Sequence, residues 1–353
     1  MMYKKSPLRY PGGKSRAIKF LKDFFPKDFI EYREPFFGGG SVGIYLLQTY
    51  QNLKIVNYKL NSKTFDSKSS LHTQCKDSQK NLISLFADIQ AQCESLQANQ
   101  EIKFYANDIN YDLYCFWQIL KTQSTELIQE IQNIKDTCTN GRELYTLLLN
   151  RRSENLSDFQ RAIDFFILNR ISFSGTIDCG GYSQKAFESR FTQSSIERLK
   201  DISEVIRDIE FSCKDYESLI QKEGKNVFIF LDPPYFSATK SKLYGKKGDL
   251  HTGFNHERLC EILKKTKHTF LLTYDDSEFV RELYKDFYIK EWSLQYGMNN
   301  FKQTKAELGR ELLISNDYFS SQEKEHKISM EYFVETKQYR RYIYDRKLKT
   351  TFD

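Results

Sequence analysis

A carboxylate and an aromatic ring follow directly on a buried apolar run in the second half of the chain. Residues 227–231, Val-Phe-Ile-Phe-Leu, are rich in β-forming side chains and predict a strand buried on both faces of a parallel sheet. The next residues are Asp232, Pro233, Pro234 and Tyr235, and neither proline has an N–H to continue a central ladder. Open α/β sheets bind their ligands at the carboxyl ends of strands, so these groups are expected at a ligand site.

These four residues form a clamp that suits a planar amino group. The Asp232 carboxylate can accept one N–H of an exocyclic amine, and the Pro233 carbonyl can accept the other. The Tyr235 ring can stack on the face of the base that carries the amine. The structural alternative is a proline turn after a buried strand, with Asp232 capping backbone groups.

Two glycine-containing turns near the N-terminus are predicted to lead into helices. The first, residues 7–14, precedes a helix expected from Ser15 to Phe25, and Lys14 would then stand near a helix N-terminus, where an anion binds well. The second, residues 34–41, separates a strand expected at 29–33 from a helix expected at 42–47. A glycine loop in this position brings backbone amides against a nucleotide-like cofactor, although an ordinary surface turn fits either segment alone.

Two acidic residues follow further predicted strands. Residues 103–110 predict a strand that ends in Asp108, where a carboxylate can accept hydrogen bonds from ribose hydroxyls. Asp215 follows a strand expected at 209–214. Either residue could instead cap the helix that comes after it.

Together these segments resemble the Dam-like, alpha-class DNA adenine-N6 methyltransferases. Residues 10–14 are similar to motif X of that family, 34–41 to motif I, 107–110 to motif II and 232–235 to motif IV. The motifs stand in the family's order and spacing. The resemblance implies an α/β fold, a Rossmann-like S-adenosylmethionine-dependent methyltransferase sheet with an inserted, mainly helical target-recognition subdomain.

The resemblance also implies roles for individual residues. Tyr10 and Lys14 would contact S-adenosyl-L-methionine, with Lys14 near its methionine carboxylate. Gly38 and Gly40 would line the cofactor, Asp108 would hold its ribose, and Asp215 would contact its adenine ring. The catalytic residues would be Asp232, Pro233, Pro234 and Tyr235, and no metal is expected.

The implied reaction is direct methyl transfer to N6 of an adenine that has been swung out of duplex DNA, because a stacked and paired amino group cannot be reached. Such an enzyme would be the modification enzyme of a restriction-modification system, and a restriction endonuclease recognising the same site is a candidate partner. Three alternatives stay open at this point: methylation of cytosine N4, methylation of RNA, and a catalytically silent DNA-binding protein with a methyltransferase shell.

The expected organisation has four parts. Residues 1–114 and 205–319 form the catalytic domain, 115–204 the target-recognition subdomain, and 320–353 a charged tail. A polar insertion at 51–102 departs from the family pattern, and its later part, 81–96, predicts an amphipathic helix. Further predicted elements are a helix at 255–265, a strand at 269–273, and a terminal hairpin of strands at 288–294 and 308–315. Loops at 169–185, 237–252 and 299–305 are expected to face DNA or the site.

Composition sets only broad limits. The chain has 53 Lys and Arg against 47 Asp and Glu, a formal net charge of +6, which permits a polyanionic partner without requiring one. Seven scattered cysteines without a Cys-x-x-Cys pair favour reduced thiols over a zinc site or disulfides. No export signal or membrane-spanning run is seen, so a cytoplasmic protein without a membrane partner is expected.

Overall fold

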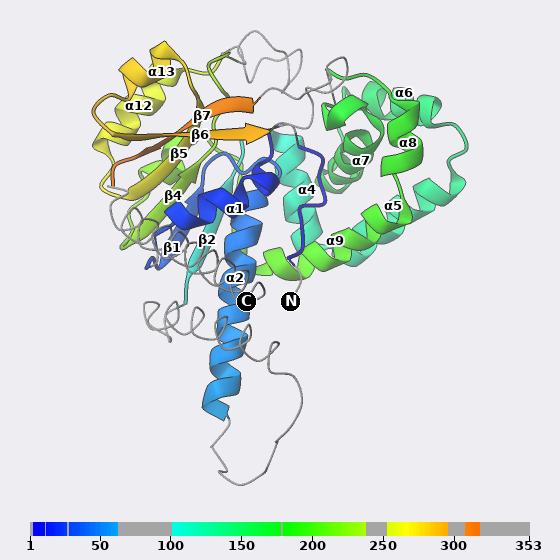
Figure 1. The fold of residues 1–353 in the computed structure, drawn as a ribbon. Helices are drawn as coiled ribbons and strands as arrows, with labels where there is room; N and C mark the ends of the chain where they lie inside the picture. The colour runs from blue at the N-terminus through cyan, green and yellow to red at the C-terminus, as the bar shows by residue number, and fades with distance from the viewer. Residues whose placement is uncertain are drawn as a thin grey trace, which may run out of the picture.

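The structure, a computed structural model, describes residues 3–10, 12–26, 28–62, 101–177, 179–237, 253–295 and 308–317. Its centre is a mixed sheet with helices on both faces (Figure 1). The strands are β1 (Glu31–Glu34), β2 (Lys103–Asn107), β3 (Ile209–Ser212), β4 (Val227–Leu231), β5 (Thr269–Asp275), β6 (Tyr288–Gln295) and β7 (Leu308–Ser315). Their order in the sheet is β3-β2-β1-β4-β5-β7-β6.

The strand order places the switch point of the sheet between β1 and β4. Strands β1 to β5 pair in parallel, and β7 pairs antiparallel with both β5 and β6. All five residues of β4 are buried, as its apolar run predicts. In open α/β sheets ligands bind outside the carboxyl ends of the strands at such a switch point. The arrangement is that of a Rossmann-like α/β sheet, which confirms this part of the predicted fold class. The target-recognition role of the inserted helices stays a prediction.

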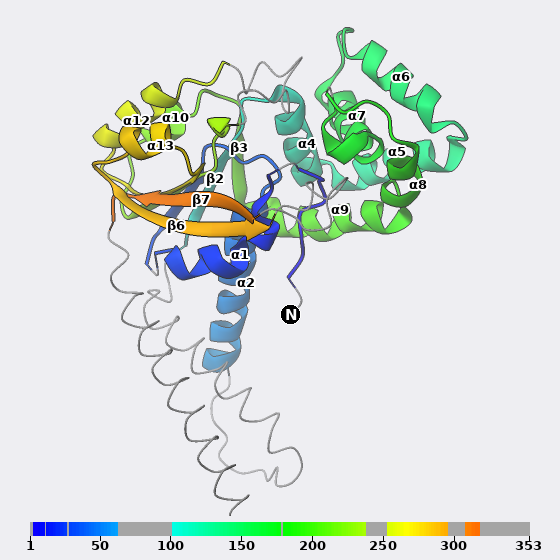
Figure 2. The same ribbon diagram turned by 45° about the horizontal axis from the view of Figure 1, so that its top comes forward.

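Helices cover the two faces of the sheet in separate groups (Figures 1 and 2). On one face α10 (Glu217–Ile220), α12 (His256–Lys265) and α13 (Glu278–Leu283) bury their apolar residues against alternate side chains of β4, β5 and β7. On the other face lie the short helix α1 (Ile18–Leu21), α2 (Ser41–Ser62) and α4 (Tyr111–Thr122). The sheet is therefore fixed from both sides, and only its carboxyl edge stays available for a site.

Further helices lie between β2 and β3 and form a cluster beside the sheet (Figure 1). They are α5 (Ser124–Thr137), α6 (Gly141–Arg151), α7 (Asp158–Ile171), α8 (Gln184–Arg190) and α9 (Gln193–Val205). The 3-10 turn η3 (Phe173–Gly175) follows α7, and η4 (Ile206–Asp208) leads from α9 into β3. Helix α7 begins with a capping box in which Ser157 and Gln160 bond each other's backbone N–H. The strands and the terminal antiparallel pair of β6 and β7 agree with their predicted positions.

Two predicted helices differ from the structure. The helix expected at 42–47 does not stop there: α2 continues to Ser62, so residues 51–62 of the predicted insertion belong to this helix. The helix expected from Ser15 to Phe25 is divided into η1 (Lys14–Arg16), α1 and η2 (Lys22–Phe24). The helix expected at 81–96, most of the loop expected at 237–252, the loop at 299–305 and the tail from 320 lie outside the described residues.

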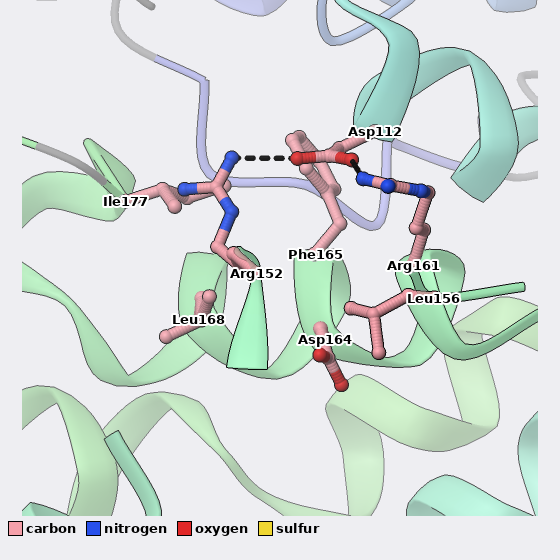
Figure 3. A pocket seen from close by; sticks show the side chains of 8 residues that line it. All are labelled: Asp112, Arg152, Leu156, Arg161, Asp164, Phe165, Leu168 and Ile177. Carbon is pink, nitrogen blue, oxygen red and sulfur yellow. Dashed lines mark hydrogen bonds and ion pairs between the residues drawn. The ribbon is translucent and has the colours of Figure 1, made fainter. Parts of the chain in front are cut away.

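A small cavity among the helices shows how the cluster is held to the sheet (Figure 3). Asp112, near the start of α4, accepts hydrogen bonds from Arg152 at 2.6 Å and from Arg161 at 2.8 Å. Nearby, Arg151 pairs with Asp164. The cavity is lined by Asp112, Arg152, Leu156, Arg161, Asp164, Phe165, Leu168 and Ile177. One carboxylate thus ties α4, which follows β2, to α7.

None of the described helices combines the length and the apolar character that a membrane span would need.

Candidate active site

The Asp232 carboxylate stands at the end of β4 with one oxygen anchored and the other open. Lys14 Nζ donates to Asp232 Oδ1 at 2.7 Å, and the hydroxyl of Thr273 on β5 donates to the same oxygen at 2.8 Å. No described residue donates to Oδ2. The side chain is 22% exposed, whereas that of Lys14 is 3% exposed. An oriented, partly accessible carboxylate of this kind can accept an N–H from a substrate amine.

The residues after Asp232 are held by the neighbouring strand β5. Asp275, at its carboxyl end, accepts hydrogen bonds from the backbone N–H groups of Phe236 at 2.8 Å and Ser237 at 3.0 Å. The Tyr235 ring stacks on Tyr274 with a centroid distance of 5.9 Å. Its hydroxyl is buried, and the ring as a whole is only half-buried. The loop therefore presents an aromatic surface beside the open oxygen of Asp232.

The prolines complete this edge of the site. Pro233 is buried and Pro234 half-buried. No described N–H donates to the Pro233 carbonyl, so its oxygen keeps its acceptor capacity. Lys14 Nζ lies 4.9 Å from the centroid of the Tyr235 ring. The predicted residues Lys14, Asp232 and Tyr235 are thus brought together.

The glycine loop between β1 and α2 is fixed by Asp108 and by Trp117. The backbone N–H of Gly38 donates to Asp108 Oδ2 at 2.9 Å, and Trp117 Nε1 donates to the Gly38 carbonyl at 3.0 Å. Gly38 has φ +49°, and a Cβ there would lie 2.8 Å from the Tyr10 ring. Only glycine fits this combination of positive φ and close approach. The predicted residues Tyr10, Gly38 and Asp108 are therefore neighbours.

Asp108 is expected to hold a ribose, and its surroundings change its pKa. Burial raises the pKa of Asp108 to about 6, against the opposing effect of hydrogen bonds from the backbone N–H groups of Asn110 and Gly38. Asn110 caps α4 by accepting a hydrogen bond from the backbone N–H of Leu113. Asp108 thus contacts the glycine loop, and Asn110 is the residue that caps α4.

Gly40, with φ +66°, packs against the Phe37 ring.

Asp215 lies apart from the two groups described above. It forms a pair of hydrogen bonds with the Arg258 guanidinium, both at 2.9 Å, and accepts the backbone N–H of Glu217 at 3.0 Å. The hydrogen bonds from Arg258 lower the pKa of Asp215. Beside it the rings of Phe36, Tyr216 and Phe254 pack together with centroid distances between 5.2 and 5.7 Å. Asp215 therefore borders an aromatic cluster that begins at the glycine loop.

Sequence reasoning missed several residues that shape the site. Thr273, Asp275 and Trp117 each make a hydrogen bond that fixes a predicted residue or its loop, and Glu311 on β7 is buried beside them. Only Asp275 had a sequence signal, since it stands with Asp276 at the end of a predicted strand. Thr273 lies within an apolar run and Trp117 within a helix, where neither differs from an ordinary core residue.

The loop after α7 contacts the segment that carries Tyr10. Asn169 accepts a hydrogen bond from the backbone N–H of Arg9 at 2.9 Å and donates to its carbonyl at 2.8 Å. A Cβ at Gly175, which has φ +77°, would lie 2.3 Å from the Arg9 carbonyl oxygen. The start of the segment that was expected to touch DNA is thus fixed against Arg9, next to Tyr10.

Known proteins with sequences similar to this chain include DNA methyltransferases. A family model described as D12 class N6 adenine-specific DNA methyltransferase matches residues 10–105 and 92–298. Type II methyltransferase M.MjaIII of Methanocaldococcus jannaschii is 23% identical over 340 residues, 88% of this chain and 98% of the relative. Type II methyltransferase M.CviBI of Paramecium bursaria Chlorella virus NC1A is 22% identical over 306 residues, 86% of this chain and 95% of the relative.

A DNA adenine methylase of Salmonella typhimurium is 22% identical over 201 residues, 52% of this chain and 68% of the relative. The matched family segments include every residue that the structure places around the glycine loop and the Asp232 clamp, apart from Glu311. The chain belongs to the D12 class of N6 adenine-specific DNA methyltransferases.

Proposed function

We propose that this protein transfers a methyl group from S-adenosyl-L-methionine to the exocyclic N6 of an adenine flipped out of double-stranded DNA. The observation that carries the proposal is the state of Asp232. Lys14 and Thr273 donate to its Oδ1, none of the described residues donates to Oδ2, and the Tyr235 ring and the Pro233 carbonyl stand beside it. Two acceptors beside an aromatic ring match the two N–H donors and the ring plane of a base that carries an exocyclic amino group, such as adenine.

The chain's own residues supply orientation and electrostatics. Asp232 Oδ2 and the Pro233 carbonyl accept the two amino hydrogens, and Tyr235 stacks on the base. These contacts oppose delocalisation of the nitrogen lone pair into the ring and direct it at the methyl carbon. Bound S-adenosylmethionine supplies an electrophilic methyl group on a sulfonium. No covalent enzyme intermediate and no metal are part of the proposed reaction.

The residues around the glycine loop fit this cofactor. Asp108 offers a half-buried carboxylate for ribose hydroxyls, and the loop of Gly38 and Gly40, with Tyr10 packed against it, lets backbone approach the cofactor closely. Asp215 and its aromatic cluster suit an adenine ring. Lys14 is expected near the methionine carboxylate, and its ammonium group also lies at the clamp, where it donates to Asp232.

We also propose that the helices between residues 115 and 204, with the loop at 169–185, contact the DNA duplex. The names of two relatives, both type II methyltransferases, support a role as the modification enzyme of a restriction-modification system. A cognate endonuclease that recognises the same site would then be its partner.

The test is methyl transfer by the purified protein. Labelled S-adenosylmethionine is supplied with duplex DNA, single-stranded DNA or RNA, and the labelled nucleoside is identified. N6-methyladenine formed on duplex DNA supports the proposal. N4-methylcytosine, label on RNA alone, or cofactor binding without transfer would each replace it with one of the alternatives named above.

A further inference from the structure

Glu311 is a buried carboxyl group behind the clamp that none of the roles assigned above uses. The residue is 1% exposed, and neither of its carboxylate oxygens accepts a hydrogen bond from a described residue. In the sheet it lies directly opposite Asp275 on β5 and Trp292 on β6. Directly opposed residues of antiparallel strands project from the same face. Phe20 stacks on Trp292, so this is the face that α1 covers (Figure 2).

The charged and titratable groups that face Glu311 come from three other elements. They are Lys14 from η1, Asp232 and Tyr235 from the loop after β4, and Asp275 from β5. Lys14 is the one cation in this set, and its ammonium group already bonds Asp232. Asp275 is occupied by two backbone N–H groups. The Tyr235 hydroxyl faces Glu311 without a hydrogen bond of ordinary geometry.

Glu311 and Asp232 thus both act electrostatically on one buried ammonium group, and only Asp232 is hydrogen-bonded to it. Burial raises the pKa of Glu311 to about 7, with Lys14 acting in the opposite direction and Asp232 adding to the rise. At neutral pH both the ionised and the protonated form are accessible. Only the ionised form carries a negative charge that can compensate the ammonium group of Lys14. The Lys14 side chain is 3% exposed and has little contact with water.

We propose that Glu311 is a positioning residue for methyl transfer, and that its ionised form compensates the charge of the Lys14 ammonium group while Asp232 carries the proton released from the substrate. The inference rests on the proposed function.

In the reaction the N6 lone pair forms the new bond to the methyl carbon, and the carbon–sulfur bond breaks with its electrons left on sulfur. One N–H bond of N6 then breaks, its electrons return to nitrogen, and the proton moves to Asp232 Oδ2.

The charge of Lys14 explains why a second carboxylate is needed. Once Asp232 is protonated, it no longer compensates the buried ammonium group, and an uncompensated buried charge is strongly unfavourable. Ionised Glu311 supplies the missing negative charge, so proton uptake leaves the group of Lys14, Asp232 and Glu311 neutral. Protonated Glu311 would leave it with a net positive charge. The rate of transfer should therefore follow the ionised fraction of Glu311.

The experiment is a single-turnover rate measurement against pH, from about 5.5 to about 8.5, with saturating cofactor and DNA from a strain without adenine methylation. For the wild-type protein we expect the rate to rise roughly tenfold per pH unit below about pH 7 and to level off above it. Glu311→Gln should remove this rise and lower the plateau by roughly tenfold or more. The matched control is Glu291→Gln on the adjacent strand β6, whose side chain is 68% exposed and pairs with Arg281.

Melting temperature and cofactor binding are measured for each variant, and Glu311→Asp provides a second test if the Gln variant does not fold. The Asp variant should keep the pH-dependent rise with a shifted midpoint. A Glu311→Gln profile that matches the wild type, or an Asp variant with an unshifted midpoint, would overturn the inference. If the proposed function itself is wrong, the wild-type protein shows no methyl transfer at any pH, and this result is distinct from the outcomes that concern Glu311.

Discussion

Thr273→Val is the change that most directly probes how the clamp is held. Val has nearly the shape of Thr but no hydroxyl, so Asp232 Oδ1 loses the hydrogen bond that Thr273 donates at 2.8 Å and keeps the one from Lys14. Thr273 is fully buried, so water cannot replace the missing donor. A hydrogen bond to a charged group contributes about 1.5 to 3 kcal/mol. If this energy acts on orientation in the transition state, kcat falls by roughly 10- to 150-fold.

The assay separates the reaction from binding and folding. Single-turnover methyl transfer gives the rate, calorimetry gives the cofactor dissociation constant, and thermal denaturation gives Tm. We expect the rate to fall while the cofactor dissociation constant changes little, since Thr273 does not lie at the glycine loop. Thr269→Val, at the start of the same strand, is the matched control. An unchanged rate in Thr273→Val, or a loss of cofactor affinity as large as the loss of rate, would refute this reasoning.

Three further predictions concern the surrounding structure. Gly38→Ala should reduce cofactor affinity in calorimetry, because the new Cβ would lie 2.8 Å from the Tyr10 ring at φ +49°; unchanged affinity would count against the loop geometry. Asp112→Ala should lower the free energy of unfolding in urea by about 1 to 3 kcal/mol, because the two arginines bound to it in Figure 3 lose their shared carboxylate; Glu130→Ala, at an exposed position of α5, serves as control. The pKa of Asp108 is raised to about 6, so cofactor affinity should fall as pH falls through 6, where protonation removes an acceptor for ribose hydroxyls; Asp108→Asn should be insensitive to pH in that range.

Local sequence patterns predicted the elements that carry the site. The apolar run at 227–231 followed by two prolines defined both β4 and its end, because burial and the missing N–H donors act within a few residues. The glycine turn and Asp108 were likewise placed after their strands by local pattern. The polar composition after Leu47 led to a wrong helix end, since α2 continues through Gln and Lys residues that have good helix propensity.

Contacts between distant segments could not be predicted in the same way. Lys14 and Asp232 are 218 positions apart, and nothing near Lys14 indicates that its ammonium group bonds a carboxylate rather than a ligand. Glu311 stands in a strand pattern where a charged residue usually faces solvent. It is buried because β7 lies between β5 and β6 and because α1, far away in the sequence, packs on this face of the sheet.

The most direct test of the central claim is sequencing of DNA from cells that express the wild-type protein or Asp232→Ala, with N6-methyladenine scored against base context. The account predicts modified adenines within one short sequence motif for the wild type and none for the variant. It also predicts that purified Asp232→Ala binds the cofactor nearly as well as the wild type. Adenine methylation that persists in the variant would contradict the role assigned to Asp232, and so would a loss of cofactor affinity as large as the loss of methylation.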